Sequence, residues 1–167
     1  MAGIYIHIPF CRKLCYYCDF YHVITHEDNS LFIHALKKEA QLRSAYLADN
    51  TVSTIYFGGG TPSVLSVKEI ASVLDHIRDL FIVDRETEIT IEINPDDTDI
   101  HYLKELKKTG VNRISIGVQS WRDEDLKMMN RRHTAAQAQE ALENAIKAGF
   151  INISADLIYG IPGMGFN

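Results

Sequence analysis

Residues 5–18 read YIHIPFCRKLCYYC, and this stretch joins a strand pattern to a cysteine motif. In its first part isoleucine alternates with Tyr5 and His7, which predicts a strand over Ile4–Ile8 with one aliphatic and one polar face. The cysteines follow at once, in a loop expected at the carboxyl end of that strand. Because α/β proteins form their ligand sites at that end of their strands, the stretch places a candidate site beside the first strand.

The strand pattern recurs along the chain, with a helical pattern in each interval. Further strands are expected over Ser53–Phe57, Glu88–Ile93, Arg113–Val118 and Asn152–Ile158. Helices are expected from about Ser30 to Tyr46, from a capping box of Ser66 and Glu69, from about Asp99 to Lys108, and from Thr134 and Gln137 to Gly149. Strands that alternate with helices predict a parallel sheet with right-handed crossovers.

The two faces of the expected sheet differ in chemistry. One face is aliphatic in every strand, as in Ile89, Ile91 and Ile93, and suits a layer of helices. The other face is polar, which a dry core would not tolerate without partners. We therefore expect an α/β fold of the partial TIM-like (βα) barrel type, with a parallel sheet, helices outside and a polar ligand in the lumen. The alternative is a sheet whose polar face lies in solvent.

The chain is expected to form one domain over residues 1–167, with about five βα units. Five strands do not close a barrel, so this domain is expected to be the N-terminal part of a larger core. The remaining strands and a C-terminal domain would then be absent from this chain.

Composition excludes several classes of protein. Seventeen basic against 22 acidic residues, a net charge of −5, lack the excess of Lys and Arg that a nucleic-acid partner requires. No apolar run approaches the roughly 18 residues of a transmembrane segment, and the start lacks the features of a signal peptide. Three cysteines within eight residues fit a metal site in a reducing compartment better than disulfides. We expect a cytoplasmic protein.

The cysteines Cys11, Cys15 and Cys18 are candidate metal ligands. Thiolates suit an iron-sulfur cluster or zinc. A structural zinc site needs a fourth ligand, which His7 or His22 would supply, and would make the chain a zinc-stapled interaction domain. Three ligands for a cube of four irons would instead leave one iron open to a ligand with amino and carboxylate groups. Buried cysteines without a metal are the third possibility.

The spacing CxxxCxxC, with Tyr17 before the third cysteine, resembles the signature of the radical S-adenosylmethionine (radical SAM) superfamily. The block YIHIPFC at residues 5–11 is similar to the oxygen-independent coproporphyrinogen III oxidase family in particular. Further blocks match that family in order: FGGGTPS (57–63), EINP (92–95), RISIGVQS (113–120), NRRHT (130–134) and DLIYGIPG (156–163). Together they cover almost the whole chain.

The resemblance implies that the three cysteines hold a 4Fe-4S cluster. It also implies S-adenosylmethionine in contact with Tyr5, Tyr17, Gly59, Gly60, Thr61, Glu92, Gln119, Arg131 and Asp156. His133 is expected either to support Arg131 or to lie at the surface. Taken alone, these residues have ordinary readings as well: a tight glycine turn, a Glu paired with an Arg in the lumen, and a solvated Arg131. In the implied chemistry an electron from a reductase passes through the cluster and breaks a carbon-sulfur bond of S-adenosylmethionine.

One position separates two branches of this family. The oxidases carry a further cysteine two positions after the third, where this chain has Phe20. The form CDFY resembles the branch of heme chaperones, which bind heme and S-adenosylmethionine. We therefore expect a tetrapyrrole-handling protein, a heme chaperone rather than an oxidase that decarboxylates coproporphyrinogen III to protoporphyrinogen IX. The part that would recognise heme is expected beyond Asn167.

Overall fold

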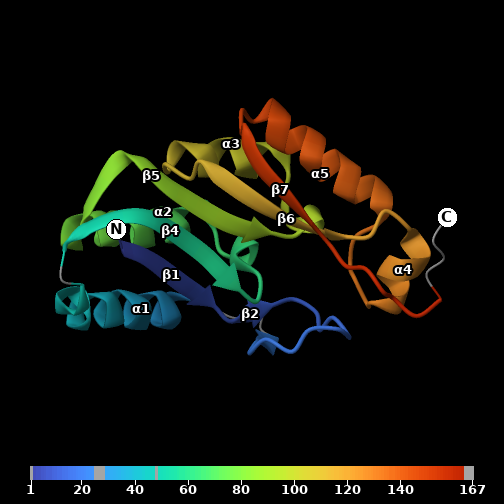
Figure 1. The fold of residues 1–167 in the computed structure, drawn as a ribbon, viewed down its shortest axis with the longest axis horizontal. Helices are drawn as coiled ribbons and strands as arrows, with labels where there is room; N and C mark the ends of the chain where they lie inside the picture. Colours follow the sequence, from blue (N-terminus) through green and yellow to red (C-terminus); the bar gives the residue numbers. More distant parts are fainter. Residues whose placement is uncertain (1, 25–28, 48, 164–167) are drawn as a thin grey trace.

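A computed structural model describes residues 2–24, 29–47 and 49–163 of the chain. Its main sheet has five parallel strands in the order β1-β4-β5-β6-β7. Their bounds are β1 Ala2–Ile8, β4 Thr51–Gly59, β5 Ile82–Ile93, β6 Arg113–Gln119 and β7 Asn152–Leu157. The spatial order follows the chain order, so each crossover moves one strand along in the same direction (Figure 1). The expected parallel α/β sheet is confirmed, with β1 and β7 as its edges.

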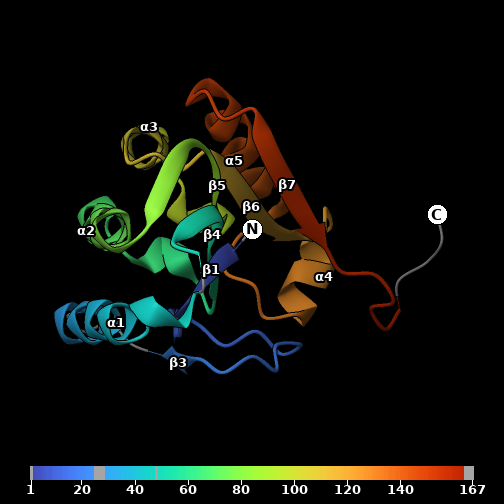
Figure 2. The ribbon, with the colours of Figure 1, turned by 60° about the vertical axis from the view of Figure 1, so that its left-hand side comes forward.

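The helices pack against the aliphatic face of the sheet. They are α1 Ser30–Leu42, α2 Val67–Leu80, α3 Ile100–Lys108 and α5 Ala135–Lys147. Figure 2 shows them along the outer side of a curved sheet. One core cluster contains the aliphatic strand residues that face the helices, together with residues of all four helices, among them Ile33, Leu74, Leu103 and Ala141. Burial of this aliphatic face, at roughly 25 cal/mol per Å² of apolar surface, is the main force that holds helices to sheet.

The helix boundaries follow local capping chemistry. Ser66 and Glu69 form a reciprocal capping box at the start of α2, and Thr134 and Gln137 form another at the start of α5. Asp99 caps α3 by accepting a hydrogen bond from the backbone of Tyr102. The starts of α2 and α5 at Ser66 and Thr134 were correctly predicted, because a capping signal depends only on neighbouring residues.

Several elements differ from the sequence expectation. The first helix stops at Leu42, and a 3₁₀ turn, η1 (Ser44–Tyr46), replaces its expected end. Strand β5 begins at Ile82 rather than at Glu88. The short helix α4 (Asp123–Met128) and the two-residue strands β2 (Phe10–Cys11) and β3 (Val23–Ile24) were not predicted. Segments this short carry too few residues to show a period.

Strand β7 is only partly covered. Ala155 and Leu157, expected on the aliphatic face, are exposed, because within the described residues no helix follows β7 to cover them.

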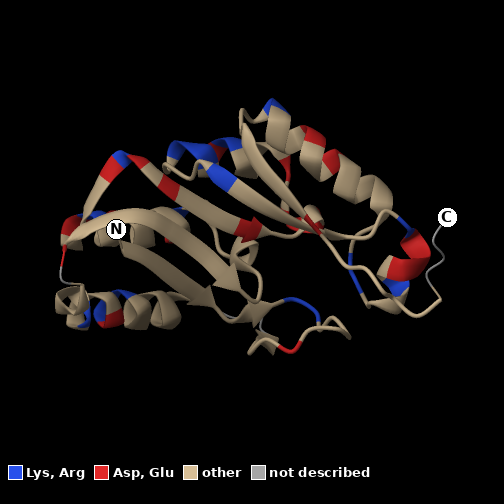
Figure 3. Ribbon diagram, in the orientation of Figure 1, with Lys and Arg blue, Asp and Glu red and all other residues tan. Residues whose placement is uncertain are grey.

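None of the helices formed by the described residues is long and apolar enough to cross a membrane. Acidic and basic positions are interspersed along the helices (Figure 3).

Candidate functional site

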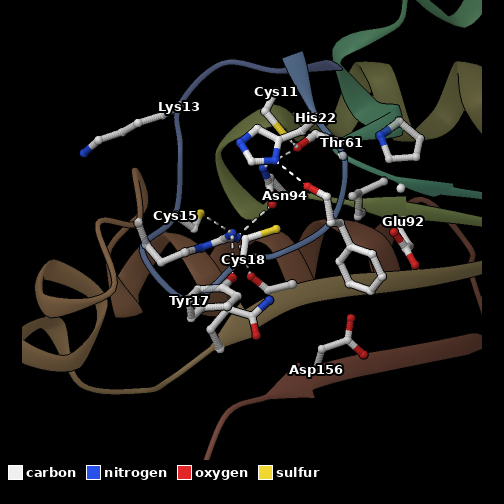
Figure 4. A pocket seen from close by; sticks show the side chains of 18 residues that line it. Cys11, Lys13, Cys15, Tyr17, Cys18, His22, Thr61, Glu92, Asn94 and Asp156 are labelled. Atoms are coloured by element: carbon white, nitrogen blue, oxygen red, sulfur yellow. Dashed lines mark hydrogen bonds between the residues drawn. The ribbon is translucent and has the colours of Figure 1, made fainter. Parts of the chain in front are cut away.

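A cavity opens at the carboxyl ends of the strands, between the sheet and the cysteine loop (Figure 4). All predicted site residues except Tyr5 line it: Cys11, Cys15, Tyr17, Cys18, Gly59, Gly60, Thr61, Glu92, Gln119, Arg131 and Asp156. They come from the ends of β4, β5, β6 and β7 and from three loops: the cysteine loop, the turn after β4 and the segment after α4. Parallel strands bring these distant segments together because their carboxyl ends meet at one edge of the sheet.

The three cysteines are free thiols, each half-buried at the cavity. The Cys11 Sγ lies 3.4 Å from the Thr61 hydroxyl, and the Cys15 Sγ accepts a hydrogen bond from Arg131 Nη1 at 3.4 Å. Burial raises the pKa of Cys11, and the bond from Thr61 partly opposes that shift. Among the described residues, no three Cys, His, Asp or Glu side chains gather in the manner of a single-ion site.

The cysteine loop is docked on the segment that follows α4. The Tyr16 backbone N–H donates to the Met129 carbonyl at 3.1 Å, and the Asn130 side chain donates to the Leu14 carbonyl at 2.7 Å. On its other side, Arg12 forms an ion pair with Asp97. The loop conformation is therefore held by protein groups on both flanks.

The glycine turn after β4 allows backbone to approach the cysteines. Gly59 has a φ of +113°, a conformation that favours glycine. A Cβ at Gly60 would lie 2.7 Å from the Phe10 carbonyl oxygen and 3.0 Å from the Cys11 Sγ. Both positions therefore require glycine, and the turn places its backbone directly against the cysteine loop.

Arg131 is the most connected side chain of the site. Its Nη2 donates to Asn94 Oδ1 and to the Gly117 carbonyl, each at 2.8 Å. Its Nη1 reaches the Tyr17 hydroxyl at 3.3 Å in addition to Cys15, while its Nε is buried without a hydrogen-bond partner among the described residues. The reading of Arg131 as a solvated surface residue is therefore wrong.

Glu92 faces the cavity from the end of β5. The Tyr56 hydroxyl donates to its Oε1 at 2.7 Å, and no cation of the described residues forms an ion pair with it, contrary to the alternative of a lumen arginine partner. Burial raises the pKa of Glu92, while the Tyr56 bond and the Gly59 backbone lower it. Tyr5 lies beside this pair and its ring stacks on that of Tyr56. The Tyr5 hydroxyl is hydrogen-bonded to His7 Nδ1, and the side chain is 59% exposed.

Gln119 and Asp156 close the far side of the cavity. Gln119 ends β6 with a φ of +66°, a left-handed conformation that is uncommon outside glycine. Both oxygens of Asp156 accept from the Ser115 hydroxyl, at 3.1 Å each. Asp156 is otherwise exposed to the cavity, so its carboxylate has capacity for further donors.

His133 differs from both expectations. It is 3% exposed, so it is not a surface residue, and its Nε2 bonds the Val118 carbonyl at 3.0 Å rather than Arg131. Burial, followed by the nearby charge of Arg131, lowers the pKa of His133 to about 4. The ring is therefore neutral at pH 7 and fixes the chain between β6 and α5.

Three residues of this region were missed by the sequence analysis: Tyr56, Asn94 and Asp97. Asn94 lines the cavity, and the Asp97 side chain is 1% exposed, where it accepts from Ser63 and pairs with Arg12 and Arg132. The strand-end rule that identified Glu92 applies equally to Asn94, the first residue after β5. Nothing in the sequence marks Asp97, because its partners come from three separate segments.

Comparison with known proteins agrees with this geometry. The family model described as "Radical SAM superfamily" matches residues 5–167. This chain belongs to the radical SAM superfamily. Membership implies a 4Fe-4S cluster and S-adenosylmethionine as the cofactors of this radical SAM domain.

Two kinds of relative are similar to this radical SAM chain. The heme chaperone HemW of Lactococcus lactis is 42% identical over 160 residues, which cover 95% of this chain and 41% of that protein. The oxygen-independent coproporphyrinogen III oxidase of Escherichia coli K12 is 34% identical over 162 residues, 96% of this chain and 35% of that protein. The solved structure of the E. coli oxidase (HemN), described as a radical SAM enzyme, matches with a TM-score of 0.87, at 34% identity over 95% of this chain and 37% of the other. The chain thus spans about two fifths of the length of these relatives.

The residues present fit the two implied groups. Three free thiols offer the soft ligand set of an iron-sulfur cluster. Gly60 lets the backbone approach Cys11 where a Cβ would clash, and the Arg131 Nε–H has no partner among the described residues. A ligand with carboxylate, amino and hydroxyl groups finds partners for each around the cavity.

Proposed function

We propose that this chain is the cofactor-binding part of a heme chaperone, with a 4Fe-4S cluster on Cys11, Cys15 and Cys18 and S-adenosylmethionine beside it. The single observation that carries the proposal is that three free thiols and the polar ends of four strands face one cavity. The chain is the N-terminal part of the radical SAM core, residues 1–167, in a cytoplasmic protein.

Each polar side chain has a role toward S-adenosylmethionine. Arg131 binds its carboxylate, since a guanidinium is suited to that planar anion. Glu92, held by Tyr56, accepts from a cationic or hydroxyl group, and Gln119 and Asp156 bond the ribose hydroxyls. Gly59, Gly60 and Thr61 form the backbone turn against the methionine end, with Tyr5 and Tyr17 at the margins. The chemistry that such a cluster supplies when bound is one-electron reduction of a sulfonium, with the electron coming from a reductase.

The cofactor proposal is tested by anaerobic reconstitution with iron and sulfide. We expect about four irons per chain and a brown protein that absorbs near 400 nm, on the stoichiometry of the cluster. Stoichiometric zinc without uptake of iron would support the zinc-stapled interaction domain and overturn the proposal. Isothermal titration of the reconstituted protein with S-adenosylmethionine tests the second ligand.

The heme-chaperone branch is supported by Phe20. It lines the cavity near the cysteines and is 70% exposed, at the position where the oxidases carry a further cysteine. A phenylalanine cannot ligate metal or relay a proton, but its face can stack on a planar macrocycle. The identity to the L. lactis chaperone, 42% against 34% for the E. coli oxidase, points the same way.

The competing function is coproporphyrinogen III oxidation, which the match to the solved oxidase supports. The full-length protein, reconstituted anaerobically with S-adenosylmethionine and a reductant, separates the two. We expect it to bind heme stoichiometrically and to leave coproporphyrinogen III unchanged. Several turnovers to protoporphyrinogen would assign the protein to the oxidases and make Phe20 a tolerated substitution.

A further inference from the structure

A continuous hydrogen-bonded chain connects two of the three cysteines through one amide. Asn94 Oδ1 accepts from Arg131 Nη2 at 2.8 Å, and Arg131 Nη1 reaches the Cys15 Sγ at 3.4 Å. On the other side, Asn94 Nδ2 donates to Thr61 Oγ1 at 3.3 Å, and that oxygen lies 3.4 Å from the Cys11 Sγ. Figure 4 shows Asn94 between the thiols, with Thr61 and the cysteines around it.

The chemistry of the partners fixes the direction of both bonds of the Asn94 amide, and of the Thr61–Cys11 bond once Cys11 is a thiolate with no hydrogen to donate. A guanidinium has donors only, so the Asn94 atom that faces Arg131 must be the amide oxygen. The amide nitrogen therefore faces Thr61 and donates to its oxygen. The Thr61 oxygen accepts that bond with one lone pair, and its own hydrogen is the donor to the Cys11 sulfur when Cys11 is a thiolate ligand. Asn94 thus orients one donor toward each of two thiols.

Asn94 is itself held in place by its backbone. Its N–H donates to the Ser63 hydroxyl at 3.2 Å, and its carbonyl accepts from the Asp97 N–H at 3.0 Å. Ser63 in turn donates to the buried Asp97 carboxylate at 3.1 Å. A residue that is fixed at its backbone and engaged at both ends of its amide has little freedom to turn, so the two donors are set before any ligand binds.

We propose that Asn94 is a positioning residue for the cluster, which orients the Thr61 hydroxyl toward Cys11 and the Arg131 guanidinium toward Cys15 and so raises the reduction potential. Hydrogen bonds to the sulfurs of an iron-sulfur site stabilise its more negative, reduced form. The inference rests on the proposed cluster and assigns a role to a residue that touches neither iron nor S-adenosylmethionine in the function proposed above.

The test is a redox titration of the reconstituted full-length protein without S-adenosylmethionine, followed by electron paramagnetic resonance. Asn94→Leu keeps the approximate volume and removes both amide bonds. We expect the equilibrium constant for reduction to fall about tenfold, the lower end of the effect of losing one hydrogen bond to a charged group, which is a shift of about 59 mV to more negative potential for one electron. A merely structural role would change stability and leave the potential where it was.

Asn112→Leu is the matched control. Asn112 also uses both ends of its amide, but with backbone partners at the other end of the sheet: Ile89 N–H and the Thr87 carbonyl, each at 2.9 Å. The control should lower stability without moving the potential. An unchanged potential in Asn94→Leu at full iron content, or an equal shift in both variants, would overturn the inference.

Thr61→Val supplies a second route if Asn94→Leu does not load iron. It removes the donor to Cys11 alone, so the potential should again become more negative, and Thr61→Ser should restore it. In the double variant the effect of Asn94→Leu should shrink, because part of it acts through Thr61. No shift in Thr61→Val would contradict the inference. Failure of the unmodified protein to bind iron would instead contradict the proposed function, so the two failures are distinguishable.

Discussion

The two ends of the sheet contain similar polar residues but use them differently. At the amino end, Thr87 donates to the Val52 carbonyl at 2.9 Å, and Asn112 bonds backbone groups only. At the carboxyl end, Thr61 and Asn94 bond side chains that belong to other segments. Polar side chains that hydrogen-bond backbone N–H and C=O groups stabilise the fold. Polar side chains that hydrogen-bond other side chains fix the positions of the residues that line the cavity.

The same contrast appears in the unsatisfied atoms. The buried side-chain polar atoms without a hydrogen-bond partner among the described residues are Asp96 Oδ1, Arg131 Nε and His133 Nδ1. All three lie in the segments that follow the carboxyl ends of β5 and β6. An unpaired buried polar atom costs about 1–3 kcal/mol. The amino end has no such atom among the described residues, and of the three at the carboxyl end Arg131 is the one that lines the cavity.

The largest effect is expected for the cysteines. Cys11→Ala, Cys15→Ala and Cys18→Ala should each abolish the cluster, measured as iron and sulfide per chain after anaerobic reconstitution. The unfolding free energy of the metal-free chain should change by less than about 1 kcal/mol, because each thiol makes at most weak hydrogen bonds there. Retention of four irons in any of these variants, on the cluster stoichiometry, would remove that cysteine from the ligand set.

Next comes Arg131. Arg131→Ala should weaken S-adenosylmethionine binding by about 1.5–3 kcal/mol, the range for a charge-assisted hydrogen bond, as measured by isothermal titration of reconstituted protein. Arg78→Ala is the control, because the partners of Arg78 among the described residues are Asp75 and the Thr109 carbonyl, away from the cavity. If Arg131→Ala and Asp156→Ala both bind with unchanged affinity, the ligand has been placed wrongly.

A reciprocal result is expected at the amino end. Asn112→Leu should lower the unfolding free energy by about 0.5–1.5 kcal/mol, the net value of a hydrogen bond, because it removes the partner of the Ile89 N–H and of the Thr87 carbonyl at an exposed position. Urea denaturation measures this loss. Affinity for S-adenosylmethionine should be the same as in the unmodified protein. A parallel loss of affinity would show that the two ends are not independent.

The smallest effect concerns pH and His133. Burial lowers the pKa of His133 to about 4 in the folded chain, below the value of about 6.5 for an unfolded one. The unfolded state therefore takes up a proton first, so the stability from this neutral ring is complete above about pH 6.5 and is lost as pH falls toward 4. His133→Gln should reduce the fall in stability between pH 7 and 4.5 by on the order of 1 kcal/mol. The exposed His101→Gln variant should not.

Much of the fold was predictable because its signals are local. Alternation in Ile89, Ile91 and Ile93 predicted both a strand and its buried face, and the capping residues Ser66 and Thr134 predicted helix starts. The end of the first helix was not predictable in this way. None of residues 43–50 is proline or glycine, so no local stop signal marks the change to a 3₁₀ turn.

The cavity residues were predictable to the extent that they end strands or belong to a spaced motif. Glu92, Gln119 and Asp156 satisfy the first condition, and the cysteines satisfy the second. Neither the burial of His133 nor the contacts of Asp97 with Arg12, Ser63 and Arg132 could be predicted. Their surroundings are assembled from segments far apart in the sequence, so neither spacing nor periodicity records them.

The left-handed backbone of Gln119 has a consequence for laboratory evolution. A non-glycine residue in that conformation costs on the order of 1–2 kcal/mol, so Gln119→Gly would relieve the cost and make the chain more heat-resistant. The same substitution would remove the amide that faces the cavity. A library selected for thermal tolerance alone should therefore enrich glycine at this position and lose cofactor affinity as it does so, and adding S-adenosylmethionine to the selection should reverse the enrichment.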